Sequence, residues 1–392
     1  MPLDPPEALQ GWRVWWRRLR VMTVKELLQL LRDPVLLFVI LYGFTADVYN
    51  AGSGVTLQLS HAALAVQALA RSAASRELAS RFLPPEFRLD HPLARDAEGE
   101  RLLDDGQVLM VLTVPPRFGA DLLAGRPAHL QMQVDATNTV LGFLAYSYGT
   151  QIVATYGLET ALRQAGLGTG GGSTLDAPVV DNRPRVLFNP NQNDAWFMSI
   201  SELLNVITAF SILLPAAAMV REKERGTIEQ LLVSPLTPLQ VMAPKVLAMM
   251  AVIHLGITIS LLTVLGPVFE VPLRGSLTLF FVVTTLYIVT LSGLGLFIAT
   301  VTRNLAQAAM LGILVLAPMI FLSGLWTPPE AMPALMRALS RVSPLYYYMD
   351  ACYGILLKGA GLDTLWDAVL GIVALGVLFV GVGLWRFRRQ FD

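Results

Sequence analysis

The sequence predicts an α-helical polytopic membrane protein with six transmembrane helices, cytosolic N and C termini, and a small α/β extracytoplasmic domain between the first and second spans. The first observation is composition. Of the 392 residues, 54% are hydrophobic and 15% are charged, and the mean hydropathy of +0.55 is too high for a soluble chain of this length. The second is that several windows of about 20 residues carry almost no charge, which is the length of a helix that crosses a ~30 Å hydrocarbon layer. The third is the distribution of Lys and Arg, which sets the orientation.

Residues 1–34 are expected to form an amphipathic helix that lies in the cytosolic interface of the membrane and ends at Pro34. Aromatic rings suit the membrane–water boundary, and Arg side chains suit anionic headgroups on the cytosolic side. The residues that carry this pattern are Trp12, Trp15, Trp16, Arg17 and Arg18. The alternative is that part of this segment lengthens the first span. Membrane lipid is therefore a predicted partner.

The first span is predicted at 35–55, although its uninterrupted apolar core is only 12 residues long and ends before Asp47. That length alone suits an interfacial or re-entrant segment as well as a span. Five clearer apolar runs follow and form a five-span transmembrane domain over 196–392. They cover residues 196–220, 246–269, 277–301, 305–326 and 366–384.

The basic residues orient these spans. If both termini are cytosolic, the inside segments hold fourteen Lys and Arg residues and the short outside segments hold four. Eleven further Arg residues lie in the stretch 51–195, which the positive-inside rule does not count because large domains translocate regardless of charge. Two cytosolic termini require an even number of spans, so the weak first segment is predicted to cross the membrane.

Residues 56–195, between the first two spans, are predicted to form the extracytoplasmic α/β domain and a linker. The predicted strands are 62–66, 107–114 and 129–134, and the predicted helices are 75–83, 118–125 and about 138–164. Alternation of strands with helices is typical of a small α/β domain. The Gly-rich stretch 166–173 is expected to be a flexible linker, because no Lys follows its glycines as in a phosphate-binding loop.

A dense run of alternating charge, "REKER", follows the second span and opens a predicted cytosolic coupling loop at 221–245. Basic residues alone would anchor a loop, but acidic residues add nothing to that anchoring. After Gly226 a short helix is expected, with Thr227 as N-cap and Gln230 completing a capping box. Such a helix either offers a surface to a soluble partner or belongs to a solvated loop whose ion pairs are worth about 0–1 kcal/mol each. The residues concerned are Arg221, Glu222, Lys223, Glu224, Arg225, Gly226, Thr227, Glu229, Gln230, Leu231, Leu232 and Pro235.

The stretch "REKERGTIEQLLVSPL" resembles the cytosolic motif of ABC exporter permeases of the second membrane-domain type, the class of multidrug and daunorubicin-resistance permeases. "RSAASREL" is similar to the start of that family's outer domain, residues 321–361 to its outer re-entrant region, and "LWRFRRQ" to its basic C-terminal end. The resemblance covers nearly the whole chain. Where the family often carries a Pro-Gly pair early in the second span, this chain has "SISELLNVIT", so no substrate path is carried over at that point.

The resemblance implies a permease subunit of an ATP-driven ABC exporter in a bacterial inner (cytoplasmic) membrane. Such a subunit pairs with a second copy or a paralogue and presents a coupling helix to a separate ABC ATPase subunit. ATP and Mg²⁺ are expected on that ATPase and no cofactor on this chain, because the chain contains no G-x-x-x-x-G-K-[ST] sequence. Glu222, Glu224 and Glu229 are then expected to meet basic groups on the ATPase, while Leu231 and Leu232 dock in a groove. A periplasmic adaptor protein is a further partner that the resemblance leaves open, and no nucleic acid is expected.

Polar residues inside the spans are the candidates for the substrate pathway, because ionisable groups are costly against lipid. They are Glu202, Asn205, Thr208 and His254. Glu202 either lines the pathway or reaches the outer surface, and His254 is a packing residue as readily as a transport residue. Tyr346, Tyr347 and Tyr348 are expected in an outer aromatic belt. No catalytic set or metal-ligand spacing is found, so the chain is not expected to be an enzyme.

Two other functions remain open. An ion-coupled secondary transporter is expected to carry several buried carboxylates and an internal repeat, whereas only Glu202 and His254 lie well inside the spans. A non-transporting membrane assembly factor would use the outer domain as its working part. Lipophilic drugs, lipids and glycan precursors are all compatible with the sequence as cargo.

Overall fold

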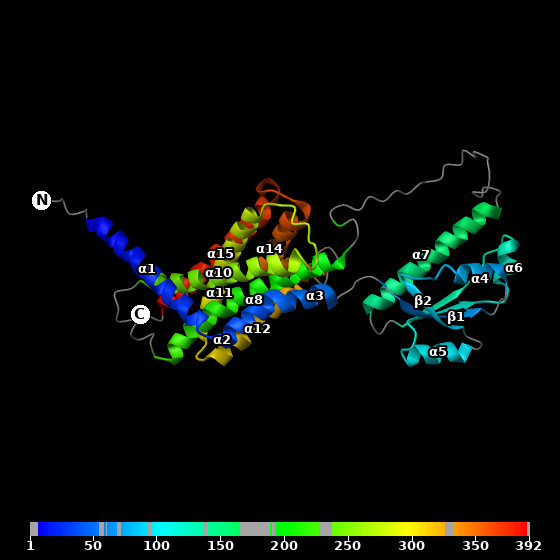
Figure 1. Ribbon diagram of the computed structural model, residues 1–392, viewed down its shortest axis with the longest axis horizontal. Coiled ribbons are helices and arrows are strands. Elements are labelled where there is room, and N and C mark those ends of the chain that lie inside the picture. Colours follow the sequence, from blue (N-terminus) through cyan, green and yellow to red (C-terminus); the bar gives the residue numbers. More distant parts are fainter. Residues whose placement is uncertain are drawn as a thin grey trace. The chain divides into compact units, whose positions relative to one another are not determined.

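The computed structural model describes residues 7–54, 59, 61–68, 72–92, 96–135, 139–164, 189, 193–226, 237–325 and 332–389. The chain divides into two compact units (Figure 1). The helical unit comprises Met1–Val55 and Arg185–Asp392, and the α/β unit comprises Thr56–Pro184. The α/β unit is thus an insertion into the helical unit.

The helical unit consists of long helices that run side by side, with α8 and α11 near its centre (Figure 1). Its described elements are α1 (Glu7–Leu31), α2 (Pro34–Tyr42), η1 (Gly43–Asp47), α3 (Val48–Gly54), α8 (Asp194–Glu224), α10 (Pro238–Ser260), η2 (Leu261–Leu265), α11 (Leu277–Val301), α12 (Leu305–Phe321), α13 (Ala334–Ser340), α14 (Pro344–Tyr353), η4 (Gly354–Lys358) and α15 (Leu362–Arg388). The elements labelled η are π-helical turns, which continue a neighbouring α-helix with a wider turn.

Five helical segments in the described part of the chain are long and apolar enough to cross a membrane. They are Pro34–Gly54, Asp194–Glu224, Leu239–Leu265, Leu277–Val301 and Leu362–Arg388. The weak first span is therefore one continuous segment of 21 residues, in which η1 joins α2 to α3. The sixth predicted span contains the 17-residue helix α12, which is about 26 Å long at 1.5 Å per residue. A sixth crossing remains a prediction.

Local sequence explains where two of these helices begin. The side chain of Asp33 accepts a hydrogen bond from Leu36 N at 3.1 Å, so Asp33 caps α2 and separates it from α1. Thr237 and Gln240 form a capping box at the start of α10. The predicted span begins at residue 246 and leaves Lys245 in the loop. That boundary is wrong, since Lys245 lies inside α10.

The centre of the helical unit is closely packed around α8, α11 and α15. A Cβ atom added to Gly295 would lie 2.3 Å from the carbonyl oxygen of Ile212, so α11 and α8 approach each other at a position that admits no side chain. Tyr348 of α14 is fully buried, and its ring stacks on Tyr287 with centroids 3.8 Å apart. Tyr348 therefore does not belong to an outer aromatic belt, because α14 packs against α11 and α15.

The α/β unit contains a four-stranded mixed sheet in the order β2-β1-β3-β4. Its elements are β1 (Ala62–Ala68), α4 (Ala73–Ala79), β2 (Phe87–Pro92), α5 (Asp96–Asp104), β3 (Met110–Val114), α6 (Phe118–Leu123), β4 (Gln131–Val134) and α7 (Thr139–Gln164). β1 pairs in parallel with β2 and β3, and β4 is antiparallel to β3. The predicted alternation of strands and helices is confirmed, while β2 and α5 were not foreseen.

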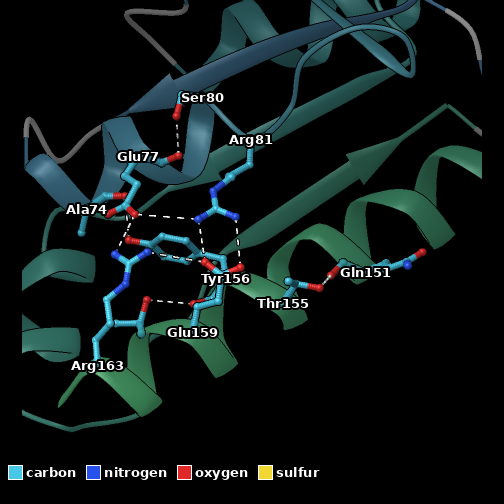
Figure 2. A network of polar contacts seen from close by, with 10 residues as sticks. Ala74, Glu77, Ser80, Arg81, Gln151, Thr155, Tyr156, Glu159 and Arg163 are labelled. Carbon is cyan, nitrogen blue, oxygen red and sulfur yellow. Dashed lines mark hydrogen bonds and ion pairs between the residues drawn. The ribbon is translucent and has the colours of Figure 1, made fainter. Parts of the chain in front are cut away.

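Ion pairs fasten α7 to α4 on one face of this sheet (Figure 2). Arg81 lies 2.6 Å from Glu159, and Arg163 lies 2.9 Å from Glu77. The hydroxyl of Tyr156, whose ring is buried, donates a hydrogen bond to the carbonyl oxygen of Ala74 at 3.2 Å (Figure 2). These polar contacts, together with the apolar core beside them, thus hold α7 in the α/β unit.

Candidate functional site

The charge run 221–225 forms the last turn of α8 and the residue that caps it. The predicted span ends at residue 220, but the helix continues to Glu224 because Arg, Glu and Lys are good helix formers. Basic side chains also suit the negative end of a helix dipole. Gly226 then adopts φ +67°, a left-handed conformation that commonly ends helices. The run is therefore part of a rigid element.

Glu222 is bound inside the chain by two lysines. It is 8% exposed, and its Oε1 lies 2.7 Å from Nζ of Lys245, which is 1% exposed. The same ammonium group lies 2.9 Å from Oε1 of Glu26, which is 5% exposed. Lys25 completes the group at 3.3 Å from Glu222 and 3.4 Å from Glu26. Two positive and two negative groups from α1, α8 and α10 thus balance one another, as buried charges require.

The two carboxylates also affect the pKa of Lys25. Partial burial on its own lowers the pKa of Lys25, but the attraction of Glu26 and Glu222 and hydrogen bonds to both carboxylates raise the pKa above its ordinary value of 10.5. The lysine is therefore charged throughout the physiological range.

The next two residues of the run bind the ends of two other helices. The ammonium group of Lys223 donates hydrogen bonds to the carbonyl oxygens of Ala299 and Thr302, at the C-terminal end of α11. Oε1 of Glu224 accepts a hydrogen bond of 2.8 Å from Leu305 N, at the first residue of α12. A cation at a helix C-terminus and an anion at a helix N-terminus both match the helix dipoles.

We call these contacts the charge network. Its members are Lys25, Glu26, Asp33, Arg221, Glu222, Lys223, Glu224 and Lys245. Arg221 belongs to it through Asp33, the cap of α2, at 3.8 Å. The network joins the end of α8 to α1, to α10, to the N-cap of α2 and to the facing ends of α11 and α12.

The structure describes half of the predicted coupling residues. Arg225 and Gly226 are exposed where the loop begins. Glu222 and Glu224 have described partners in the same chain, so their expected contacts with an ATPase remain predictions. The other predicted residues lie outside the described part of the chain. They are Thr227, Glu229, Gln230, Leu231, Leu232 and Pro235.

Two of the predicted pathway residues lie together. Nδ2 of Asn205 donates a hydrogen bond to Oε2 of Glu202 at 3.3 Å. Glu202 lies on the helix against which η1, the element that ends at Asp47, packs. The elements η1 and α3 pack against α8, which brings the first span and α8 together here.

Thr208 and His254 lie elsewhere. Thr208 is fully buried, and its hydroxyl lies 2.8 Å from the hydroxyl of Tyr287 in the helix core. Residues six apart are displaced by about 120° around a helix, so Thr208 faces a different side of α8 from Glu202. Nε2 of His254 lies 3.0 Å from Oγ1 of Thr285 and links α10 to α11. The two residues are therefore not brought to Glu202 and Asn205.

The predicted amphipathic helix is present as α1. Trp12 and Trp16 are 59% and 48% exposed, and their rings pack with Trp15 into one aromatic cluster. Trp15 and Leu19 line an apolar groove of about 320 Å³ between α1, α10, α11 and α15. An apolar groove beside exposed aromatic rings and the exposed Arg17 and Arg18 is suited to contact with lipid.

Comparison with known proteins identifies the family to which this chain belongs. The family model described as ABC-2 family transporter protein matches residues 27–385. The chain belongs to the ABC-2 transporter family. It is 32% identical over 366 residues to the inner membrane transport permease YhhJ of Escherichia coli K12, covering 93% of this chain and 96% of the relative. It is 30% identical over 389 residues to the probable multidrug ABC transporter permease YbhR of the same organism, covering 96% of this chain and 99% of the relative.

Membership makes this chain a membrane permease subunit of an ABC transporter, and the family resemblance drawn from the charge run is confirmed. The ABC-2 match begins at residue 27 and ends at residue 385, so it includes every described element of the helical unit from α2 to α14 and most of α15. The family also implies an ABC ATPase as partner and a paired permease.

Sequence reasoning missed two residues of this ABC-2 permease that the structure makes prominent. They are Glu26 and Lys245. A lone Lys within the apolar stretch "VMAPKVLAMM" is a sign of a buried charge that needs a counter-ion. The identity of that counter-ion was not visible, because Glu26 lies 219 residues away along the chain.

Proposed function

We propose that this chain is the permease subunit of an ATP-driven exporter in a bacterial inner membrane, with both termini and the coupling segment 221–245, which contains the loop between α8 and α10, in the cytosol. It pairs with a second copy or a paralogue to form the translocation pathway. A separate ABC ATPase binds ATP and Mg²⁺ and moves the helices through the loop. The names of the relatives, an inner membrane transport permease and a probable multidrug permease, support this assignment. The distribution of Lys and Arg also supports it, since the segments assigned to the cytosol hold fourteen of them and the short outside segments hold four.

The observation that carries the proposal is the charge network. A loop that only anchors the chain needs no buried ion pairs, which cost desolvation energy when they form. Here the residues before the loop hold the ends of α1, α10, α11 and α12. We infer two roles for the motif. Residues 227–236 contact the ATPase, and Glu222, Lys223 and Glu224 pass its movement to the helices.

Copurification tests the first role. The tagged chain is extracted from its native membranes, and bound proteins are identified by mass spectrometry for a G-x-x-x-x-G-K-[ST] sequence. Leu231→Asp is expected to lose the ATPase while the helical unit keeps its unfolding temperature. The Lys245→Met variant is expected to copurify with the ATPase but to transport less cargo for each ATP hydrolysed. The proposal fails if no such ATPase copurifies with the unmodified chain.

Labelling tests the orientation. Cys352 is fully buried, so a cysteine introduced by Glu229→Cys is the main target of a membrane-impermeant maleimide. We expect labelling in inverted membrane vesicles and none in intact cells. Labelling in intact cells would place the loop outside and contradict the coupling role.

A second candidate function is ion-coupled secondary transport, and the half-buried Glu202, which accepts a hydrogen bond from Asn205 inside the helical unit, favours it because acidic side chains inside the membrane form proton relays in such transporters. The two functions differ in their energy source. Export by the reconstituted complex should stop with vanadate and persist with a protonophore if ATP drives it. The reverse pattern would select ion coupling.

A further inference from the structure

The apolar groove beneath α1 is not filled by the side chains that surround it. Leu239, Leu247 and Val289 line the groove and are exposed, although α1 packs on α10. A second apolar groove of about 250 Å³ continues the first between α11 and α15, since Val289 and Val380 line both. Apolar surface of this kind in a membrane protein is covered by hydrocarbon, which is as apolar as Leu.

The groove has the length of one membrane leaflet. It reaches along α10 from Leu239 to Met250, which is about 17 Å at 1.5 Å per residue. Half of a ~30 Å hydrocarbon layer is about 15 Å. Leu239 lies in the first turn of α10, and Leu384, which also lines the groove, lies near the end of α15. The groove therefore opens at the end of the helical unit that the proposed function places in the cytosol.

Positive charge surrounds this end of the groove. On α15, the exposed Arg388 lies four residues after Leu384, on the stripe of the helix that lines the groove. On α1, the exposed Arg20 directly follows Leu19, whose side chain also lines the groove. Other exposed arginines of the same two helices are Arg13, Arg17, Arg18, Arg386 and Arg389. No Asp or Glu stands among the residues of either group, so both groups carry net positive charge.

Tryptophan rings place the same end of the groove at the level of the lipid headgroups. Trp15 lines the groove and packs with Trp12 and Trp16, and the exposed Trp385 follows the groove residues of α15. The guanidinium group of Arg389 lies 4.3 Å from the centre of the Trp385 ring. Aromatic rings are enriched at the membrane–water interface, so the arginines beside them lie at the depth of the phosphate groups.

We propose that this groove binds an anionic phospholipid of the cytosolic leaflet, with one acyl chain in the groove and the phosphate group between the arginines of α1 and α15. The inference rests on the proposed function, which places these helix ends in the cytosol, and adds a lipid that regulates the permease. Guanidinium groups bind phosphate through paired hydrogen bonds. Basic pockets between membrane helices on the cytoplasmic side bind anionic headgroups. A second copy of this chain seated by the same face would instead bring like charges together.

The lipid would act on the charge network through α1. Glu26 follows Leu19 by seven residues, or nearly two helical turns, and so lies on the same face of α1. Its carboxylate lies 2.9 Å from the ammonium group of Lys245 on α10. The bound chain thus supports the first half of α1, and this ion pair supports the second half. Binding of the lipid is therefore expected to fix the position of α1 and to raise the unfolding temperature of the helical unit.

The test is native mass spectrometry of the purified permease, together with any copurified ATPase, titrated with dioleoyl phosphatidylglycerol or with dioleoyl phosphatidylcholine. We expect one phosphatidylglycerol molecule per chain to bind at least tenfold more tightly than phosphatidylcholine. Arg20→Gln and Arg388→Gln should each weaken phosphatidylglycerol binding about fivefold, which is the contribution of one basic side chain near anionic lipid. Arg341→Gln, an exposed change of the same chemistry outside the groove, should leave the binding unaltered.

A further variant tests the groove apart from its charges. Ala243→Phe adds a ring inside the groove and removes no charge, so phosphatidylglycerol binding should fall to the level of phosphatidylcholine while the unfolding temperature without added lipid is kept. Brominated acyl chains test the same point in the unmodified groove. Brominated phosphatidylglycerol should quench tryptophan fluorescence more than brominated phosphatidylcholine does, and Trp15→Phe should remove the difference.

Equal binding of the two lipids, or equal binding by Arg388→Gln and Arg341→Gln, would overturn the proposal and leave the groove as ordinary lipid-facing surface. A disulfide-linked dimer formed through Leu247→Cys in native membranes would also overturn it, because a second copy of the chain would then occupy the groove. The ATPase copurification is run on the same preparation. If the ATPase copurifies without a preference for phosphatidylglycerol, this inference fails and the export function stands. If the preference is found and the ATPase is absent, the export function fails and the lipid site stands.

Discussion

Replacing Lys245 with Met tests whether the charge network holds the helix ends together. The substitution keeps a long apolar side chain and removes the ammonium group. That group lies 2.7 Å from Glu222 and 2.9 Å from Glu26, at 1% exposure of Lys245. The variant leaves two acidic side chains that are 8% and 5% exposed, with Lys25 at 3.3 and 3.4 Å as a weaker counter-ion.

The expected loss of stability follows from these distances. Unit charges about 3 Å apart attract each other by roughly 5 kcal/mol at an effective dielectric constant of ~20. Burial of the ammonium group offsets much of this attraction, and removal of one partner from a buried ion pair typically costs about 3–5 kcal/mol. At about 2–4 °C per kcal/mol for a unit of this size, the unfolding temperature should fall by about 6–20 °C.

Tryptophan fluorescence during heating is a suitable assay, because all seven Trp residues lie outside the α/β unit and report on the helical unit. Lys358→Met is the matched control, since Lys358 is exposed and a surface change is expected to cost within about 0.5 kcal/mol. The double change Glu26→Gln with Lys245→Met removes one charge of each sign, leaves Glu222 with Lys25, and should recover part of the loss.

One result would refute this reasoning. If Lys245→Met and Lys358→Met unfold at the same temperature, the buried charges contribute no more than exposed ones. The role of the charge network in transmitting force would then lose its physical basis.

Two further predictions concern packing and pH. Gly256→Ala should destabilise the helical unit by about 1–3 kcal/mol, because the added Cβ would lie 2.2 Å from the ring of Phe44. Gly381→Ala is the control, since a Cβ there would meet no atom within 4 Å and its unfolding temperature should not change. Equal unfolding temperatures of the two variants would contradict the packing argument. In the α/β unit, the hydrogen bond from Arg81 lowers the pKa of Glu159 below its ordinary 4.5, so the stabilisation is present above that pH and is lost as the pH falls through the lowered value. Hydrogen exchange in α7 should therefore differ between the unmodified chain and Glu159→Gln at pH 7, and the difference should shrink on acidification; a constant difference would argue against the ion pair.

Local patterns predicted most helices and strands because these elements are set by nearby residues. The apolar runs marked the long helices, and the strand around Met110 was recognised from its run of Val and Leu. The strand β2, "FRLDHP", was missed because its sequence has little strand character and pairing with β1 stabilises it. The start of α10 was misplaced because Lys245 was read as a loop residue, although Thr237 and Gln240 already formed a recognisable cap.

The candidate site could be predicted only in part. The residues 221–225 stand out as a charge run in an apolar chain, so their importance was visible from the sequence. The partners of Glu222 were not visible, because they come from α1 and α10 through tertiary packing. Sequence patterns identify which side chains need partners, and the fold decides which partners they receive.

The short helix α12 has a consequence for the surrounding bilayer. Its 17 residues extend about 4 Å less than a ~30 Å hydrocarbon layer if it crosses upright. A difference of this kind is met by local thinning of the lipid or by tilting of the neighbouring helices, at a fraction of a kcal/mol per Å. Because α12 packs directly on α8, membrane thickness would bias the position of the helix that bears the charge run, and the composition of the host lipid could thereby tune turnover.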